Sequence, residues 1–197
     1  AALFAGGIWL TWQLALSRPP QQRGENVLHV ESEAVLTQFV EQTNGRAKER
    51  KEAVVYVPTG VFIQHLQFSD AYNVMVSGYI WQEYNDSNRT YPDGSPVSEG
   101  IIFAETEPNA EVLDIEEVYR ETRGDTEVVG WYFRVSVREA FDYRHYPFDQ
   151  QTVWLRLWHT DFNENVVLVP DLDAYEILNP EFLPGLEEDL VLPNWSP

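Results

Sequence analysis

The side chains best suited to recognise a small molecule fall on alternate positions of three segments. They are Tyr79 and Trp81, Tyr132 and Arg134, and Trp154 and Trp158. The positions between them are mostly apolar, so a period of two places this set on the outward faces of strands. Large aromatics on a wet face indicate a surface that something covers, and Arg134 favours an anionic group. The pattern predicts ligand recognition, with packing between subunits or beneath the polar loop 83–100 as the alternative.

Catalytic and metal-binding motifs do not account for this chain. The sequence contains no phosphate-binding Gly-rich loop, no Gly-x-Ser-x-Gly and no His-Glu-x-x-His. His29, His65, His145 and His159 lie far apart, so we expect no metal site and no cofactor. Asp171 and Asp173 leave weak calcium binding open, although acids in a proline-rich tail are expected to be solvated. We therefore expect a protein that is not an enzyme.

The composition describes an acidic globular domain. The chain has 197 residues, 44% of them hydrophobic, which is enough for one domain with a sizeable core. Its 32 acidic and 13 basic residues give a net charge of -19, which argues against nucleic acid because phosphate binding needs clustered Lys and Arg. Acidity favours steering of cations, and simple solubility is the alternative. No cysteine is present, so disulfides and thiolate metal sites are excluded.

The elements that position the outward set are predicted to be strands. Odd positions from Val129 to Val137 are apolar, and a second strand over 153–158 is expected to pair with that segment around the turn Tyr146-Pro147-Phe148-Asp149. Further strands are expected over 54–68, with an edge or bulge at Pro58-Thr59-Gly60, and over 74–81, where Gly78 allows close approach of a neighbour. Segments 101–104, 112–119 and 166–169 complete the set, and residues beyond 170 are expected to be extended loop.

The N-terminal part is predicted to contain helices. Residues 1–17 are uncharged and end at Ser17, one residue before Arg18-Pro19-Pro20, and we interpret them as part of a transmembrane helix because crossing a bilayer takes about 20 residues. Residues 18–52 are predicted to be a linker with a short amphipathic helix over 33–42 that ends at Asn44-Gly45. The charged run 46–51 is expected to form a solvated loop near the membrane.

The proline turn resembles a known family when it is taken with its flanking sequence. Tyr146-Pro147-Phe148-Asp149 with Gln151 follows the aromatic-rich hairpin VFIQHLQFSDAYNVMVSGYIW and precedes LVLPNW. In this order the tract resembles the extracellular ligand-binding domain of the pentameric ligand-gated ion channel, or Cys-loop receptor, family. The lack of cysteine fits a bacterial member. The Trp-x-Pro-Asp segment that lines one wall of the family's ligand site is not recognisable.

The resemblance implies a fold, an assembly and site residues. It implies a mainly β, immunoglobulin-like antiparallel sandwich over residues 53–197 without its last strands, assembled as a pentamer on the periplasmic or extracellular side of a cell membrane. Tyr79 or Trp81 would lie on the complementary side of an intersubunit aromatic cage, and Trp158 or His159 on the principal side. Such a cage holds an amine by cation–π attraction of about 0.5 to 2 kcal/mol per contact.

Two functions follow from these observations. The first is a membrane-tethered ligand-binding sensor domain of a channel-like protein. The second is a structural accessory subunit that braces a larger membrane complex through its aromatic face, without a small ligand.

Overall fold

The computed structural model describes most of the chain between residues 30 and 178. The described residues are 6, 7, 9, 13, 30, 32–104, 113–144, 151–178, 185–187 and 190. The chain forms two compact units, of which Ala1–His29 and Glu139–Trp154 make the first, and Val30–Arg138 and Leu155–Pro197 the second.

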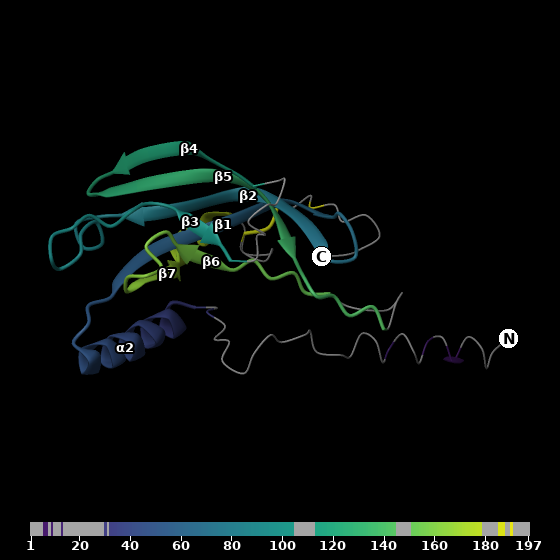
Figure 1. Cartoon of the computed structure of the whole chain (residues 1–197), viewed down its shortest axis with the longest axis horizontal. Helices are drawn as coiled ribbons and strands as arrows, with labels where there is room; N and C mark the ends of the chain where they lie inside the picture. The colour runs from purple at the N-terminus through teal and green to yellow at the C-terminus, as the bar shows by residue number, and fades with distance from the viewer. Residues whose placement is uncertain are drawn as a thin grey trace. The chain divides into compact units, whose positions relative to one another are not determined.

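The second unit is mainly β and is built on a five-stranded sheet (Figure 1). Its strands are β1 (Val55–Phe68), β2 (Asn73–Tyr84), β4 (Leu113–Arg123), β5 (Thr126–Arg138) and β7 (Val166–Pro170). They lie in the order β4-β5-β2-β1-β7. The ladders β4–β5, β5–β2 and β2–β1 are antiparallel, whereas β7 runs parallel to β1. The sheet is therefore mixed and differs from the antiparallel arrangement that was expected.

A small second sheet packs against one face of the large one. Its strands, β3 (Ile101–Phe103) and β6 (Leu157–His159), are antiparallel. The ring of Phe103 lies against that of Phe133 on β5, with centroids 5.0 Å apart. We call the face of the large sheet that contacts β3 and β6 the inner face, and the opposite one the outer face.

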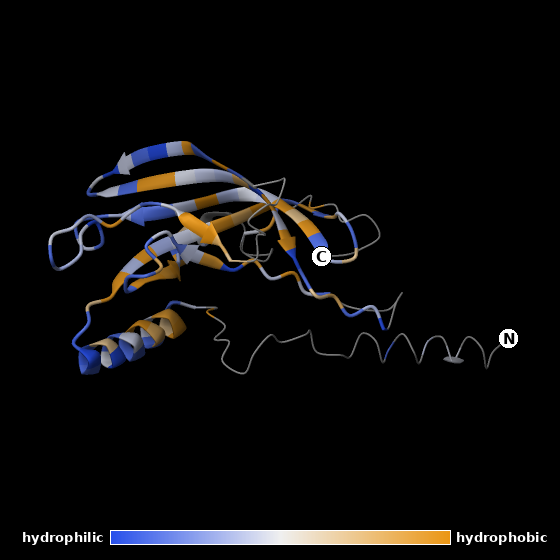
Figure 2. Cartoon of the chain, viewed as in Figure 1, coloured by the Kyte–Doolittle hydropathy of each residue, from blue (hydrophilic) through white to orange (hydrophobic). Residues whose placement is uncertain are grey.

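Alternation along β2 and β5 divides their side chains between these faces, as predicted. Val74, Val76 and Ile80 of β2 are at most 1% exposed, and so are Phe133 and Val135 of β5. These residues lie on the inner face and form the core, which appears as hydrophobic bands along the strands in Figure 2. The intervening positions lie on the outer face, because paired residues of an antiparallel ladder point to the same side.

The predicted hairpin around the proline turn is wrong in its pairing. Strand β5 pairs with β2 and β4, and β6 pairs with β3. Periodicity identifies the buried face of a strand but not its partner, which is why the sequence misassigned the ladder. The turn residues Tyr146, Pro147, Phe148 and Asp149 lie outside the described residues. Within the first unit, Gln151 Nε2 donates to the backbone oxygen of Asp142 at 3.0 Å, which joins the two arms that flank residues 145–150.

Strand β1 continues through the predicted interruption. The ladder to β2 begins at Thr59, so the missing N–H of Pro58 removes no bond from it. The irregularity instead lies between Ile63 and His65. Close approach at Gly78 is confirmed, because a Cβ there would lie 2.0 Å from the backbone oxygen of Phe62.

The predicted helix is present and longer than expected. Helix α2 spans Glu33–Arg50, and its less exposed side chains, among them Phe39 and Val40, repeat along one face. The run 46–51 was predicted to be a loop. Its Arg, Lys, Glu and Ala residues favour helix, and the basic ones suit a helix C-terminus, so the helix continues past Gly45 to Lys51, whose φ of 59° ends it.

Two further predictions concern the tail beyond residue 170 and the N-terminal residues 1–17. Helix α3 (Leu172–Leu178) lies in the tail that was predicted to be extended. Residues 1–17 lie almost entirely outside the description, with only Gly6, Gly7, Trp9 and Gln13 described, all with helical backbone. In the described part of the chain, no helix combines the length and the hydropathy needed to span a membrane.

Candidate functional site on the outer face

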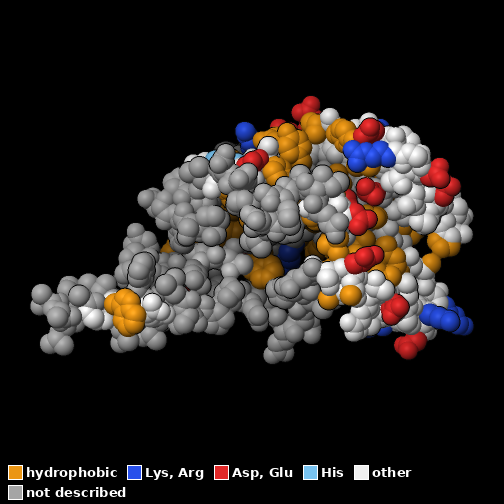
Figure 3. All heavy atoms as spheres, turned by 180° about the vertical axis from the view of Figure 1, so that it is seen from behind, with side chains coloured by type: hydrophobic (Ala, Val, Ile, Leu, Met, Phe, Trp, Pro, Cys, Tyr) orange, Lys and Arg blue, Asp and Glu red, His pale blue; other side chains and the backbone are white. Residues whose placement is uncertain are grey.

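The outer face carries a groove of about 580 Å³ between the β4–β5 hairpin and helix α3. We call it the outer groove. It is lined by Tyr79, Ile80, Trp81, Glu83, Val118, Tyr119, Arg123, Val128, Gly130, Asp171 and Ala174. Figure 3, which views the molecule from behind, shows hydrophobic side chains with acidic ones among them on that side. The lining therefore combines aromatic surface with carboxylates.

Trp81 is the most firmly held aromatic of the groove. Its Nε1–H donates to the Asp171 carboxylate at 2.7 Å. Its ring lies 5.8 Å, centroid to centroid, from the ring of Tyr175 on α3. On β1, Gly60 leaves room for the indole, since a Cβ at this position would lie 1.9 Å from Trp81 Cζ2. Three segments thus fix one side chain.

Helix α3 is fastened to β1 next to the point where β7 ends. The Tyr175 hydroxyl donates to the backbone oxygen of Val61 at 3.0 Å and accepts from the Val61 N–H at 2.7 Å. Further along, the Ile63 N–H donates to the Gly185 oxygen at 2.6 Å, and the Glu187 N–H to the Ile63 oxygen at 2.9 Å. Residues 170–178 and 185–187 therefore cover the edge of β1, and Asp171 and Ala174 form one wall of the groove.

Carboxylates dominate the charge inside the outer groove. Burial raises the pKa of the Glu83 carboxyl, the nearby charge of Asp171 raises it further, and the Arg123 guanidinium offsets part of the rise. Asp171 is 8% exposed and also accepts the N–H of Ala174 at 3.3 Å. The prediction that these tail acids are solvated is therefore wrong for Asp171, because Trp81 and the first turn of α3 enclose it.

Four of the predicted ligand-binding residues lie on the outer face. Tyr79 and Trp81 line the groove. Tyr132 pairs with Tyr79 across the β2–β5 ladder, and their rings meet edge to face at 5.5 Å, so Tyr132 supports the groove from beside it. Arg134 is exposed and lies four residues along β5 from Gly130, which is about 13 Å away at the rise of a strand.

The other two predicted residues lie on the small sheet. Trp158 is 48% exposed and stacks on Phe162 with centroids 6.0 Å apart. His159, its neighbour on β6, is 2% exposed and lies between the two sheets. A single copy of the chain therefore does not bring Trp158 or His159 into the outer groove.

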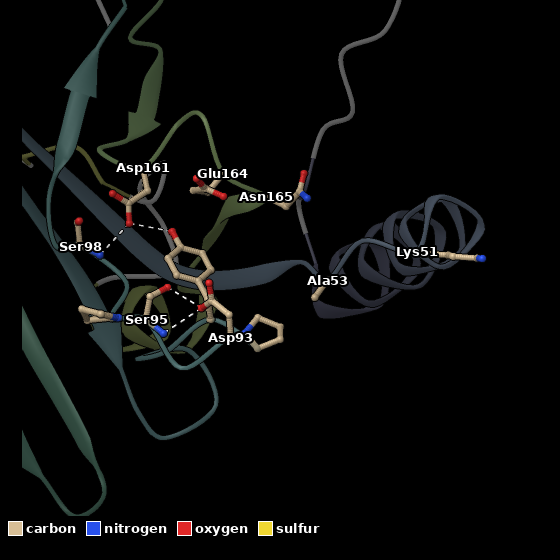
Figure 4. A pocket seen from close by; sticks show the side chains of 11 residues that line it. Lys51, Ala53, Asp93, Ser95, Ser98, Asp161, Glu164 and Asn165 are labelled. Carbon is tan, nitrogen blue, oxygen red and sulfur yellow. Dashed lines mark hydrogen bonds between the residues drawn. The ribbon is translucent and has the colours of Figure 1, made fainter.

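A second cavity, of about 520 Å³, lies between the loop after β2 and the loop before β7 (Figure 4). Two of its three carboxylates, those of Asp93 and Asp161, are occupied by the protein's own donors. The Asp161 carboxylate accepts from the Tyr91 hydroxyl and the Ser98 N–H, both at 2.8 Å. Burial raises the pKa of Asp161, but these hydrogen bonds outweigh burial and leave it below its ordinary value. Asp93 accepts from the N–H and hydroxyl of Ser95 in the same way.

Neither cavity offers a metal centre among the described residues. No group of three His, Asp or Glu side chains is placed there to hold an ion. The outer groove is the better candidate for binding, because its aromatic rings are partly open, while two of the three carboxylates of the second cavity, Asp93 and Asp161, are already engaged.

Several groove residues were not predicted from the sequence. Tyr119 and Glu83 were not singled out at all, and Asp171 was considered only as a weak calcium ligand. The role of Gly60, which lies against Trp81, was not predicted either. Alternation along β2 puts Glu83 on the same face as Trp81, so this one signal was available. The contact between Trp81 and Asp171 joins positions 90 residues apart, and no local pattern reports it.

The sequence was compared with protein-family models and with curated proteins, and neither comparison finds a match. The outer groove must therefore be interpreted from its own chemistry.

Proposed function

We propose that this protein is the ligand-binding sensor domain of a pentameric ligand-gated ion channel-like protein. In this proposal an N-terminal helix tethers it to a cell membrane, and the β unit lies on the periplasmic or extracellular side. The observation that carries the proposal is the outer groove, in which Trp81 is held rigidly while Tyr79 and Tyr119 remain 39% and 40% exposed. Rigid, half-open aromatics suit a site that a ligand and a neighbouring subunit complete.

The distribution of aromatics supports an assembly of several copies. Tyr79 and Trp81 line a groove on the outer face, whereas Trp158 lies exposed on the small sheet, which packs on the inner face. A site that needs both sets is formed between copies, with Trp158 of one copy facing the groove of the next.

We propose further that the two sheets make an immunoglobulin-like sandwich. Support comes from contacts across the layer between them, where Phe103 packs on Phe133 and the Gln82 Nε2 of β2 donates to the backbone oxygen of Gly100 at 3.3 Å.

The charge of the groove favours a small organic cation. Glu83 and Asp171 supply carboxylates, and the aromatic faces supply cation–π attraction of about 0.5 to 2 kcal/mol per contact. Arg123 lies at the same groove and favours an anionic substituent on the ligand, while Arg134 lies too far along β5 to take part.

A titration with choline and its neutral carbon isostere 3,3-dimethylbutan-1-ol tests this function. We expect choline to bind and the isostere to bind about 2- to 30-fold more weakly, since one cation–π contact is worth about 0.5 to 2 kcal/mol. Tyr79→Ala should weaken choline binding. Tyr72→Ala removes a more exposed tyrosine from the turn between β1 and β2, outside the groove, and should leave binding unchanged. Equal binding of both compounds, or a monomer in light scattering of the membrane-reconstituted protein, contradicts the proposal.

The exposed pair of Trp158 and Phe162 favours a second function, that of an accessory subunit of a larger membrane complex. These side chains are 48% and 53% exposed and form one aromatic surface. Stable co-purification with an unrelated membrane complex, lost on Trp158→Ala and accompanied by no choline binding, would favour this alternative.

A further inference from the structure

His159 lies between the two sheets with both ring nitrogens engaged. The backbone N–H of Asp161 donates to Nδ1 at 3.0 Å, so Nδ1 carries no proton. Nε2 lies 3.4 Å from the Tyr84 hydroxyl, and the ring also has a backbone hydrogen bond with Ser98. The neutral ring with its hydrogen on Nε2 satisfies both sides.

The hydrogen bonds continue from His159 into the large sheet. The Tyr84 hydroxyl donates to Gln82 Oε1 at 2.8 Å. The same oxygen accepts the N–H of Gly100 at 3.0 Å, at the start of the small sheet. Tyr84 and Gln82 are 1% and 0% exposed. We call His159, Tyr84, Gln82 and Gly100 the interlayer latch, because they join β2 to β6 and to the residue that precedes β3.

Charged and titratable groups face the latch from three segments. They are Asp161 after β6, Tyr84 on β2, and Arg89, Tyr91 and Glu99 on the loop between β2 and β3. The Arg89 guanidinium lies 4.7 Å over the Tyr84 ring and pairs with Glu99. The Asp161 charge favours a protonated ring, but its Oδ2 is occupied by Tyr91 and Ser98. Burial outweighs that charge and lowers the pKa of His159.

We propose that the interlayer latch is an acid-sensitive switch between the two sheets. When Nδ1 takes a proton from solvent, it becomes a donor and can no longer accept the N–H of Asp161. Two N–H groups then face each other. The bond between β6 and the following turn is lost, and a charge is buried next to β2. Protonation therefore favours a state in which the small sheet separates from β2. This device needs no ligand and stands independently of the proposed function.

The sign of the pH dependence follows from the lowered pKa. The unfolded chain binds a proton at this histidine as the pH falls through about 6.5, whereas the folded chain resists it, so the stability falls from there downwards. Carboxylates whose pKa the fold lowers, such as Asp161, lose their contribution at lower pH, at and below about pH 4. Between about pH 7 and about pH 5 these carboxylates stay ionised in both states, and the contribution of Glu83, whose pKa the fold raises, is common to the wild type and the variants compared.

The variant that tests the switch is His159→Asn, whose Oδ1 can accept the Asp161 N–H without titrating. We expect the folding equilibrium constant of the wild type to fall between about pH 7 and about pH 5 by a larger factor than that of His159→Asn. The control His65→Asn, at an exposed position of β1, should keep the wild-type profile. Identical profiles for wild type and His159→Asn would overturn the proposal.

Two measurements on the wild-type chain keep the test decisive even if His159→Asn does not fold. The first is the NMR titration of the His159 ring, and the second is hydrogen exchange at the Asp161 amide. Acid should remove protection from this amide, beyond the intrinsic pH dependence of exchange, as the ring becomes protonated. A ring that titrates while the amide stays protected refutes the switch.

Discussion

The two faces of β2 put neighbouring residues of one strand to different uses. Ile80, Gln82 and Tyr84 point inward and are at most 1% exposed. Tyr79, Trp81 and Glu83 point outward and line the outer groove. The inward side chains are fixed by apolar packing and the interlayer latch, whereas the outward ones leave aromatic surface and a carboxylate accessible. The strand holds the layers together with one face and offers a binding surface with the other, so the two roles should respond separately to mutation.

The largest difference between the faces is expected for Phe133→Ala compared with Tyr132→Ala. Phe133 is 0% exposed and packs on Phe103, so its truncation should lower the free energy of unfolding by about 3 to 5 kcal/mol. Tyr132 is only half-buried on the outer face, so Tyr132→Ala should lower the free energy of unfolding much less. Urea unfolding measures both. A Tyr132→Ala cost equal to that of Phe133→Ala would mean that the outer face is a second core.

The division into faces could be predicted from the sequence because successive side chains of a strand point to opposite faces, so buried and exposed residues alternate. Val129 to Val137 and Val74 to Ile80 were assigned correctly on that basis alone. The partners of those strands were not, since β5 and the segment around β6 are close in sequence but belong to different sheets.

The aromatic part of the candidate site could be predicted for a related reason, but its other contacts could not. Tyr79 and Trp81 stood out as aromatics on a wet face, which is a local signal. Asp171, Gly60 and helix α3 depend on contacts between distant segments, and the proline-rich acidic tail gave no indication of a helix. The burial of Asp171 could therefore not be predicted from the sequence and is known only from the structure.

An intermediate effect is expected where the groove meets β1, for Gly60→Ala. The new Cβ would lie 1.9 Å from the indole of Trp81, which must move away from Asp171, at a cost of about 1 to 3 kcal/mol. The indole N–H resonance of Trp81 should shift accordingly in NMR spectra.

Gly45→Ala provides the matched control for Gly60→Ala. Nothing lies within 4 Å of a Cβ at Gly45, inside α2, so this change should stabilise the chain by about 0.5 to 1 kcal/mol. If Gly60→Ala leaves both the stability and the Trp81 resonance unchanged, the groove wall is not as rigid as its contacts indicate.

The smallest effect is expected for Glu83→Gln. Its effect on stability should depend on pH in the opposite direction to that of His159 on the inner side. Burial, with the charge of Asp171 next in size, raises the pKa of Glu83, so the folded chain holds this proton more tightly than the unfolded chain does. At neutral pH the ionised carboxylate therefore lowers the stability, and Gln should raise the midpoint of thermal unfolding. As the pH falls below about 4.5 the wild type becomes protonated in both states, and the advantage of Gln should disappear. This trend is opposite to that of His159 on the inner side, where acid lowers the stability. An advantage of Gln that grows on acidification would show that Glu83 is stabilised as a carboxylate, with Arg123 rather than Asp171 as its dominant neighbour.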